Sequence, residues 1–205
     1  MRTPAATVDT LVFDLFGVLI SFDNELVYAR LAAHCESPKQ ALTRLTGLMA
    51  RTEIITGQRT LVEIHQELVD THGMTLGFSA FQSAWLEPYH GPMLGMPDLV
   101  ADLSARYRLV LLSNIDGYYW PVVRGSQPEL EHFEAQFLSF ELGLAKPDAE
   151  IFRQVCERSQ TRPERCYFVD DTRANVDAAL ALGFRTHWFR GLTGLIADLG
   201  ALGLV

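Results

Sequence analysis

Polar side chains that could carry out chemistry stand at or just after the ends of four apolar runs in the sequence. They are Asp14, Ser113, Asn114, Lys146, Asp170 and Asp171. In open α/β sheets, ligands bind outside the carboxyl ends of the strands, so side chains at these positions can meet at one edge of a sheet. Each residue alone also fits a structural role, such as a helix cap or a solvated loop lysine. Their order and combination indicate a single site.

This combination of carboxylates, a lysine and hydroxyl or amide donors suits phosphoryl transfer. A phosphate monoester repels attacking anions, so its site needs a nucleophile together with positive charge. Asp14 could attack phosphorus and form an aspartyl phosphate, while Lys146 would hold the phosphate and keep Asp14 ionised. The hydroxyl of Ser113 and the backbone N–H of Asn114 would donate to phosphoryl oxygens. Asp14 and Asp171 together would bind Mg²⁺, which prefers oxygen ligands.

Five apolar runs predict strands, and the later ones alternate with helical patterns. Strands are expected at 10–16, 107–114, 135–142, 165–171 and 184–189, and helices at 97–107, 149–159 and 172–183. Strands that alternate with short helices are typical of a parallel sheet covered on both faces. The sequence therefore predicts an α/β fold with a Rossmann-like parallel sheet as its core.

Residues 21–92 interrupt this alternation, because they show helical patterns and no convincing strand. Helices are expected at 24–36, 39–52, 60–72 and 78–86, separated by Gly, Ser and Pro residues. We interpret this segment as an all-helical cap inserted into a core domain formed by 1–20 and 93–205. The glycine-rich end of the chain, from 191 to 205, predicts a loosely packed closing helix and tail.

The overall composition narrows the classes of partner. The chain of 205 residues has a formal net charge of −8, which argues against nucleic acid or an anionic membrane as partner. Its three cysteines show no C-x-x-C pairing and predict free thiols in a reducing compartment. No signal-peptide pattern precedes the first strand, and no apolar run is long enough to span a bilayer. We expect a cytoplasmic monomer or homodimer whose partner is a small phosphate ester.

The motifs resemble those of the haloacid dehalogenase superfamily, most of whose members are phosphatases. The resemblance rests on VFDLFGVL, LVLLSN, GLAKPDAEIF and YFVDDTRANVDAALALG, which occur in the family's order. It implies the parallel α/β core, a helical cap after the first motif and Mg²⁺ as cofactor. Within the family, LLSNIDGYYWP and LSFELGLAKPDAEIF look like bacterial phosphatases that act on α-glucose 1-phosphate. The implied activity is hydrolysis of a small phosphorylated metabolite through an aspartyl phosphate.

The resemblance also implies a set of metal ligands. In the family's diacid motif the second acid contacts the metal, which makes Asp171 a ligand beside Asp14, with Asp170 behind it. The polar residue four positions further on supports the acid, and in this sequence it is Asn175. The backbone carbonyl of Phe16 could complete the set, because that role needs no particular side chain.

Phe16 departs from the pattern of most of these phosphatases, which carry a second aspartate two residues after the nucleophile. That aspartate protonates the leaving oxygen, and loss of such a general acid–base costs roughly 10²–10⁴ in rate. An anomeric phosphate, which has a better leaving group, would need this help least. One alternative is a 2-haloacid dehalogenase, because those enzymes carry an aromatic residue here, although they lack the diacid. The other is a catalytically weak phosphate-binding regulatory module.

The stretch NIDGYYW, just past Ser113, adds three aromatic residues to the neighbourhood of the predicted site. Loops at strand ends line ligand pockets, so Tyr118, Tyr119 and Trp120 could form a wall on which a sugar ring stacks. They could equally pack this loop against the cap. The sequence favours the packing role slightly and leaves both open.

Overall fold

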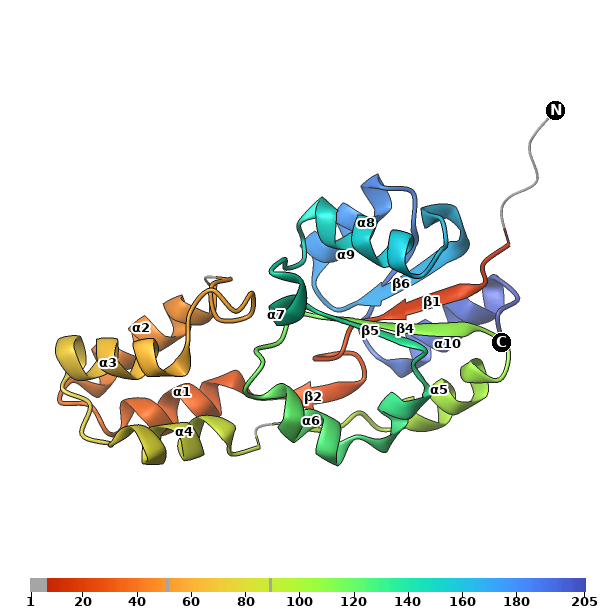
Figure 1. Cartoon of the computed structure of the whole chain (residues 1–205). Helices are drawn as coiled ribbons and strands as arrows, with labels where there is room; N and C mark the ends of the chain where they lie inside the picture. Colours follow the sequence, from red (N-terminus) through yellow and green to blue (C-terminus); the bar gives the residue numbers. More distant parts are fainter. Residues whose placement is uncertain (1–6, 51, 89) are drawn as a thin grey trace.

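The computed structural model describes residues 7–50, 52–88 and 90–205, and its core is a five-stranded parallel sheet (Figure 1). The strand order is β5-β4-β1-β6-β7, and every neighbouring pair in it is parallel. The strands are β1 (Thr10–Phe13), β4 (Arg108–Ser113), β5 (Ala135–Leu138), β6 (Cys166–Asp170) and β7 (Arg185–Trp188). The predicted α/β fold with a Rossmann-like sheet is confirmed.

Helices cover both faces of this sheet (Figure 1). Side chains of α8 (Ala149–Arg158) and α9 (Arg173–Ala181) pack in a hydrophobic cluster on one face. Those of α5 (Met96–Ser104) and α10 (Leu192–Ala201) pack in a cluster on the other. The core also contains α6 (Trp120–Ser126), α7 (Ser139–Leu142) and two 3₁₀ helices, Pro128–His132 and Pro163–Arg165.

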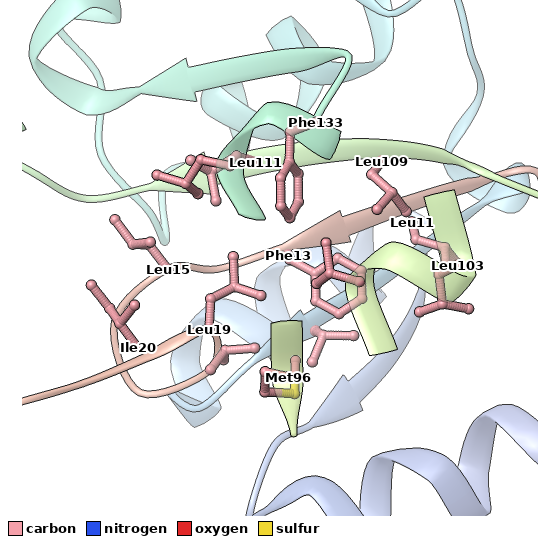
Figure 2. Close-up of a cluster of buried hydrophobic side chains, with 14 of the residues drawn as sticks. Leu11, Phe13, Leu15, Leu19, Ile20, Met96, Leu103, Leu109, Leu111 and Phe133 are labelled. Atoms are coloured by element: carbon pink, nitrogen blue, oxygen red, sulfur yellow. The ribbon is translucent and has the colours of Figure 1, made fainter. Parts of the chain in front are cut away.

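The central strand β1 explains why an uninterrupted apolar run leads up to Asp14. All four residues of β1 are buried, and the strand pairs with β4 on one side and β6 on the other. Leu11 and Phe13 belong to the cluster on one face of the sheet, and Val12 belongs to the cluster on the other. Figure 2 shows the first cluster, in which Phe13 meets Phe133 edge to face. A strand buried on both faces favours apolar residues on both, and in β1 the three residues after Thr10 are all apolar.

Four helices between β1 and β4, which we call the cap helices, lie beside the sheet (Figure 1). They are α1 (Asn24–Ala32), α2 (Pro38–Ala50), α3 (Leu61–His72) and α4 (Phe78–Leu86). They enclose a hydrophobic cluster of their own, in which Leu31, Leu68 and Phe81 are fully buried. The four predicted helices of this segment are therefore present. Residue 51 of the predicted helix 39–52 lies outside the described residues, as do 1–6 and 89.

Two parts of the predicted secondary structure were wrong. Residues 21–92 were expected to hold no strand, but β2 (Ile20–Phe22) pairs antiparallel with β3 (His90–Pro92). Each strand has three residues, and β3 contains Gly and Pro, so neither carries a strand pattern in the sequence. The run 135–142 was expected to be one strand, but its second half is helix α7, which ends at Gly143 in a left-handed conformation.

The C-terminal segment packs more tightly than the sequence predicted. Leu195 and Leu199 of α10 are fully buried in the core cluster, and Leu204 beyond the helix is nearly so. The glycines of this helix, which suggested loose packing, are the sequence neighbours of its two buried leucines. Among the residues that the structure describes, no helix combines the length and apolar character needed to cross a membrane.

Because α10 contributes fully buried leucines, truncating one of them should destabilise the fold. We expect Leu199→Ala to lower the free energy of unfolding by about 2–5 kcal/mol, through lost burial and the cavity left behind. Leu202→Ala is the matched control, since Leu202 is 38% exposed just after the same helix. Urea unfolding followed by circular dichroism measures both. Equal effects of the two substitutions would show that α10 is the loosely packed tail that the sequence suggested.

Candidate active site

Asp14 follows β1 directly. Two hydrogen bonds, one from its backbone N–H and one to its carboxylate, set its position. Its N–H donates to the carbonyl of Val169 on β6 at 2.9 Å, which continues the sheet ladder by one residue. Its Oδ1 accepts the N–H of Leu15 at 2.7 Å, so the carboxylate turns back over its own backbone. Asp14 is 7% exposed, at the carboxyl edge of the sheet. This is the placement that the strand pattern predicted.

The ammonium group of Lys146 lies between two carboxylates. Its Nζ is 2.7 Å from Asp14 Oδ1 and 2.7 Å from Asp170 Oδ2, and its side chain is 1% exposed. Burial lowers the pKa of Lys146, but the two carboxylates raise that pKa by more, so the net shift is upward. Lys146 therefore carries a full positive charge at neutral pH.

Asn114 holds the backbone of Lys146 in place. Its Nδ2 donates to the Lys146 carbonyl at 2.9 Å, and its Oδ1 accepts the Lys146 N–H at 2.9 Å. This reciprocal pair joins the loop after β4 to the loop after α7 and fixes where the lysine side chain begins. We expected Asn114 to act through its backbone N–H; the role of its side chain was not predicted, because the partner is distant in the sequence.

Asp170, at the end of β6, has hydrogen bonds to both of its carboxylate oxygens. Oδ1 accepts from the Thr172 N–H at 2.8 Å, and Oδ2 accepts from Lys146. Asn175 Nδ2 lies 3.0 Å from each oxygen. With both oxygens engaged, Asp170 is suited to orient Lys146 more than to bind an ion itself. The resemblance implied that Asn175 supports Asp171, but in the structure its partner is Asp170.

Asp171 offers carboxylate oxygens that are less engaged. Its Oδ1 accepts from the Thr172 hydroxyl at 3.2 Å, and its backbone carbonyl accepts from Trp188 Nε1 at 2.8 Å. One ligand atom from each of Asp14, Asp170 and Asp171 lies within 4.8 Å of the others. The donor set therefore fits a small cation that prefers oxygen, with Asp14 and Asp171 as the available carboxylates.

The charge balance of this cluster also favours a cation. Burial raises the pKa of Asp14 well above its ordinary value, with Asp170 adding to the shift and Lys146 offsetting part of it. Burial and then Asp170 likewise raise the pKa of Asp171. Three carboxylates share one ammonium, so the protein alone leaves excess negative charge at the edge of the sheet.

Ser113, the last residue of β4, carries a buried hydroxyl whose hydrogen bonding is incomplete. The residue is fully buried, and its Oγ has no hydrogen-bond partner among the residues that the structure describes. A buried unpaired hydroxyl costs free energy unless a ligand or water satisfies it. The position next to Asn114 and opposite β5 places this hydroxyl at the same edge as Asp14.

A cavity of about 190 Å³ opens at this edge between the sheet and the cap segment. The predicted site residues that line it are Asp14, Phe16, Asn114, Lys146, Asp171 and Asn175. The lining residues that were not predicted are Phe22, Asn24, Ile55, Ile115, Asp116 and Thr172. For Asp116, an acid three residues after Ser113 was a usable signal. For the residues of 21–92, the sequence gives no sign of which side chains face inward.

Phe16 and the aromatic stretch after Ser113 form one connected group. Phe16 meets Phe22 edge to face at 5.4 Å between ring centroids and stacks on Tyr119 at 6.5 Å. Tyr118 packs against the hydrophobic cluster of the cap helices, and Trp120 is buried in the core. The packing role expected for these aromatics is therefore the one observed, while Phe16 and Phe22 present apolar surface to the cavity.

Residues 8–183 match the haloacid dehalogenase-like hydrolase family, and this match covers most of the chain. The protein therefore belongs to this family and is a hydrolase, as its four motifs predicted. The likeness to phosphatases of α-glucose 1-phosphate remains a prediction.

Similar proteins extend over nearly the whole chain. D-Ribitol-5-phosphate phosphatase from Bacteroides thetaiotaomicron is 26% identical over 188 residues, which are 87% of this chain and 90% of that protein. A HAD-like family hydrolase from Porphyromonas gingivalis is 28% identical and superposes with a TM-score of 0.79, covering 96% of this chain and 98% of that one. A HAD family enzyme from Bacteroides thetaiotaomicron, solved with magnesium and inorganic phosphate, is 25% identical with a TM-score of 0.74, covering 90% and 95%.

Because Gly17 has no side chain, the Asp171 carboxylate can lie where a Cβ of residue 17 would be. A Cβ added there would lie 2.1 Å from Asp171 Oδ2, and the residue has a φ of +79°. We expect Gly17→Ala to displace Asp171 and to weaken Mg²⁺ binding about 10–100-fold, the usual effect of disturbing a ligand's support. Gly143→Ala is the matched control, because Gly143 also has a positive φ but no atom within 4 Å of an added Cβ. Titration calorimetry with Mg²⁺ would contradict this expectation if the two variants bound alike.

Removing the buried ammonium should destabilise the protein in a pH-dependent way. Lys146→Met leaves Asp14 and Asp170 buried without a cation, which should cost about 3–5 kcal/mol near neutral pH. The folded-state pKa of Asp14 is already raised and would rise further, so the variant loses stability as the pH rises through that pKa and regains it on acidification.

Urea unfolding in the absence of divalent cations, at about pH 5 and about pH 7.5, measures this difference. Lys39→Met is the control, because Lys39 is an exposed lysine of the cap helix α2. A loss of stability in Lys146→Met that did not change with pH would mean that packing of the lysine stem matters more than its charge.

Proposed function

We propose that this protein is a Mg²⁺-dependent phosphatase that hydrolyses the phosphate monoester of a small sugar or polyol through an aspartyl phosphate on Asp14. The observation that carries the proposal is the cluster in which Lys146 bridges Asp14 and Asp170 with Asp171 beside them. A nucleophilic carboxylate, a fixed cation and free carboxylate oxygens for a metal are the parts that phosphoryl transfer requires.

The metal would be held by Asp14, Asp171 and the backbone carbonyl of Phe16, with Asp170 and Asn175 behind them. When bound, Mg²⁺ would neutralise the carboxylates and draw phosphoryl oxygens toward the nucleophile. The excess negative charge of the cluster and the raised pKa of Asp171 support a divalent cation at this position. A structural relative that contains magnesium and inorganic phosphate supports the same assignment.

Asp14, Lys146 and Ser113 would each have a separate role in the reaction. The hydrogen bonds described for the Asp14 carboxylate go to Oδ1, so Oδ2 is the atom with room to attack phosphorus. Attack forms the Asp14–phosphate bond as the ester P–O bond breaks, and the leaving oxygen takes a proton from solvent water to give the alcohol. A water molecule then hydrolyses the Asp14–phosphate bond to return the carboxylate and inorganic phosphate. Lys146 would balance the phosphoryl charge, while the unpaired hydroxyl of Ser113 would donate to a phosphoryl oxygen.

The substrate is expected to be small, and its leaving group is expected to need little help. The cavity of about 190 Å³ is below the range of roughly 300–1,000 Å³ common for drug-sized ligands. Phe16 supplies no proton, which favours an ester such as α-glucose 1-phosphate, whose anomeric oxygen leaves readily. The relative that acts on D-ribitol 5-phosphate makes an acyclic polyol phosphate the second substrate to test.

Release of inorganic phosphate from α-glucose 1-phosphate and from D-ribitol 5-phosphate tests the proposal. We expect turnover that requires Mg²⁺, is abolished by a chelator and is restored by added metal. Asp14→Asn should reduce turnover by at least about 10³-fold, because it removes the nucleophile. Asp23→Asn, at the exposed start of α1, is the control for loss of one carboxylate.

Two results would contradict this function. Phosphate release that persisted in Asp14→Asn would place the nucleophile elsewhere. Chloride release from a 2-haloacid without Mg²⁺, and no release of phosphate from a wider panel of esters, would identify a dehalogenase, with Phe16 as the informative residue.

A further inference from the structure

Asp116 is a buried acid in the cavity to which the proposed reaction assigns no role. It lies in the loop after β4, is 3% exposed and lines the same cavity as Asp14. Among the described residues, no lysine or arginine forms an ion pair with it. A buried carboxylate without a cation is costly unless hydrogen bonds satisfy it.

The hydrogen bonds described for Asp116 come from backbone N–H groups of its own loop. Its Oδ1 accepts the backbone N–H of Tyr118 at 2.9 Å and that of Tyr119 at 2.8 Å. Tyr118 itself packs against the hydrophobic cluster of the cap helices. Both hydrogen bonds described for this carboxylate go to Oδ1, and each carboxylate oxygen has about two acceptor positions, so Oδ2 is the oxygen with room for a further donor. A donor in the cavity can take that position.

The rest of the cavity wall contrasts with Asp116. Phe16, Phe22 and Ile55 give it apolar surface, and the phosphate-binding side already holds Lys146. A ligand group that reaches Asp116 must therefore donate a hydrogen bond and must not be an anion. Hydroxyl groups meet both conditions, whereas a carboxylate or a second phosphate meets neither.

We propose that Asp116 selects the alcohol part of the ester, by accepting a hydrogen bond from a hydroxyl of a neutral polyol or sugar and by repelling an alcohol part that carries a second anionic group. This inference rests on the proposed phosphatase function and adds the specificity of the same site. Because Tyr118 donates its N–H to Asp116 and packs against the cap helices, the same carboxylate also links substrate recognition to the position of the cap.

Three five-carbon phosphate esters test this role. D-Ribitol 5-phosphate offers hydroxyl groups, n-pentyl phosphate has none, and D-ribonate 5-phosphate ends in a carboxylate. For Asp116→Asn we expect kcat/KM to fall about 10-fold with the ribitol ester, mainly through KM, because a hydrogen bond to a charged acceptor is lost. The value with the pentyl ester should hardly change, and the value with the ribonate ester should rise.

Two further variants are controls for the effect of Asp116→Asn. Asp116→Ser retains an oxygen that can accept the turn N–H groups and lacks the charge, so it should change the three esters in the same order. Asp102→Asn removes an exposed acid from α5, outside the cavity, and should leave the three values as they are. Thermal unfolding of each variant shows whether it is folded under the assay conditions.

The outcomes separate this inference from the proposed function. If neither these esters nor α-glucose 1-phosphate is hydrolysed in a way that depends on Mg²⁺ and Asp14, the proposed function fails and the role of Asp116 with it. If only α-glucose 1-phosphate is hydrolysed, the function stands and the selection of the ribitol ester by Asp116 is overturned. If the three esters are hydrolysed but Asp116→Asn leaves their ratios unchanged, only the role of Asp116 is overturned. An equal fall in kcat with all three esters, absent with p-nitrophenyl phosphate, would instead make Asp116 the proton donor and would also overturn the selection role.

Discussion

The salt bridge that Lys146 forms with Asp14 and Asp170 is the constraint on which the rest of the site depends. Desolvating three charged groups is expensive, and their attraction repays the cost only when the geometry is well defined. The surrounding contacts supply that definition: Asn114 holds the Lys146 backbone, while Thr172 and Asn175 hold Asp170. Asp14, the proposed nucleophile, is thereby kept in one orientation before a substrate arrives, which is what catalysis by positioning requires.

The parallel sheet makes this arrangement possible. Strands β1, β4 and β6 are adjacent, so their carboxyl ends lie at one edge and bring together Asp14, Ser113 and Asp170 from distant parts of the chain. Apolar residues on both faces hold the strands rigidly, and the loops add Lys146 and Asp171. The absence of a side chain at Gly17 allows the turn after β1 to pass close to Asp171.

The other wall of the cavity has a different origin. Phe22, Asn24 and Ile55 come from the segment between the two halves of the core, and Asp116 comes from a loop that contacts the cap helices. The structure thus separates two tasks. In the proposed function, the edge of the sheet carries the charges that would act on a phosphoryl group, and the cap side presents apolar and hydrogen-bonding surface that would face the alcohol part of a substrate. The ribbon β2–β3 lies where the chain passes between them.

The sequence by itself determined the fold class, the family and the residues at the strand ends, because apolar runs followed by polar residues are local patterns. It also indicated the four cap helices through their periodicity. The clamp between Asn114 and Lys146, the pairing of Asn175 with Asp170, the ribbon β2–β3 and the inward position of Asp116 were decided only by the tertiary structure. The clamp and the ribbon depend on contacts between segments far apart in the chain, and such contacts leave no periodic signal in the amino-acid order. The other two depend on the turns after β6 and β4, where hydrogen bonds over two to five residues set the direction of each side chain.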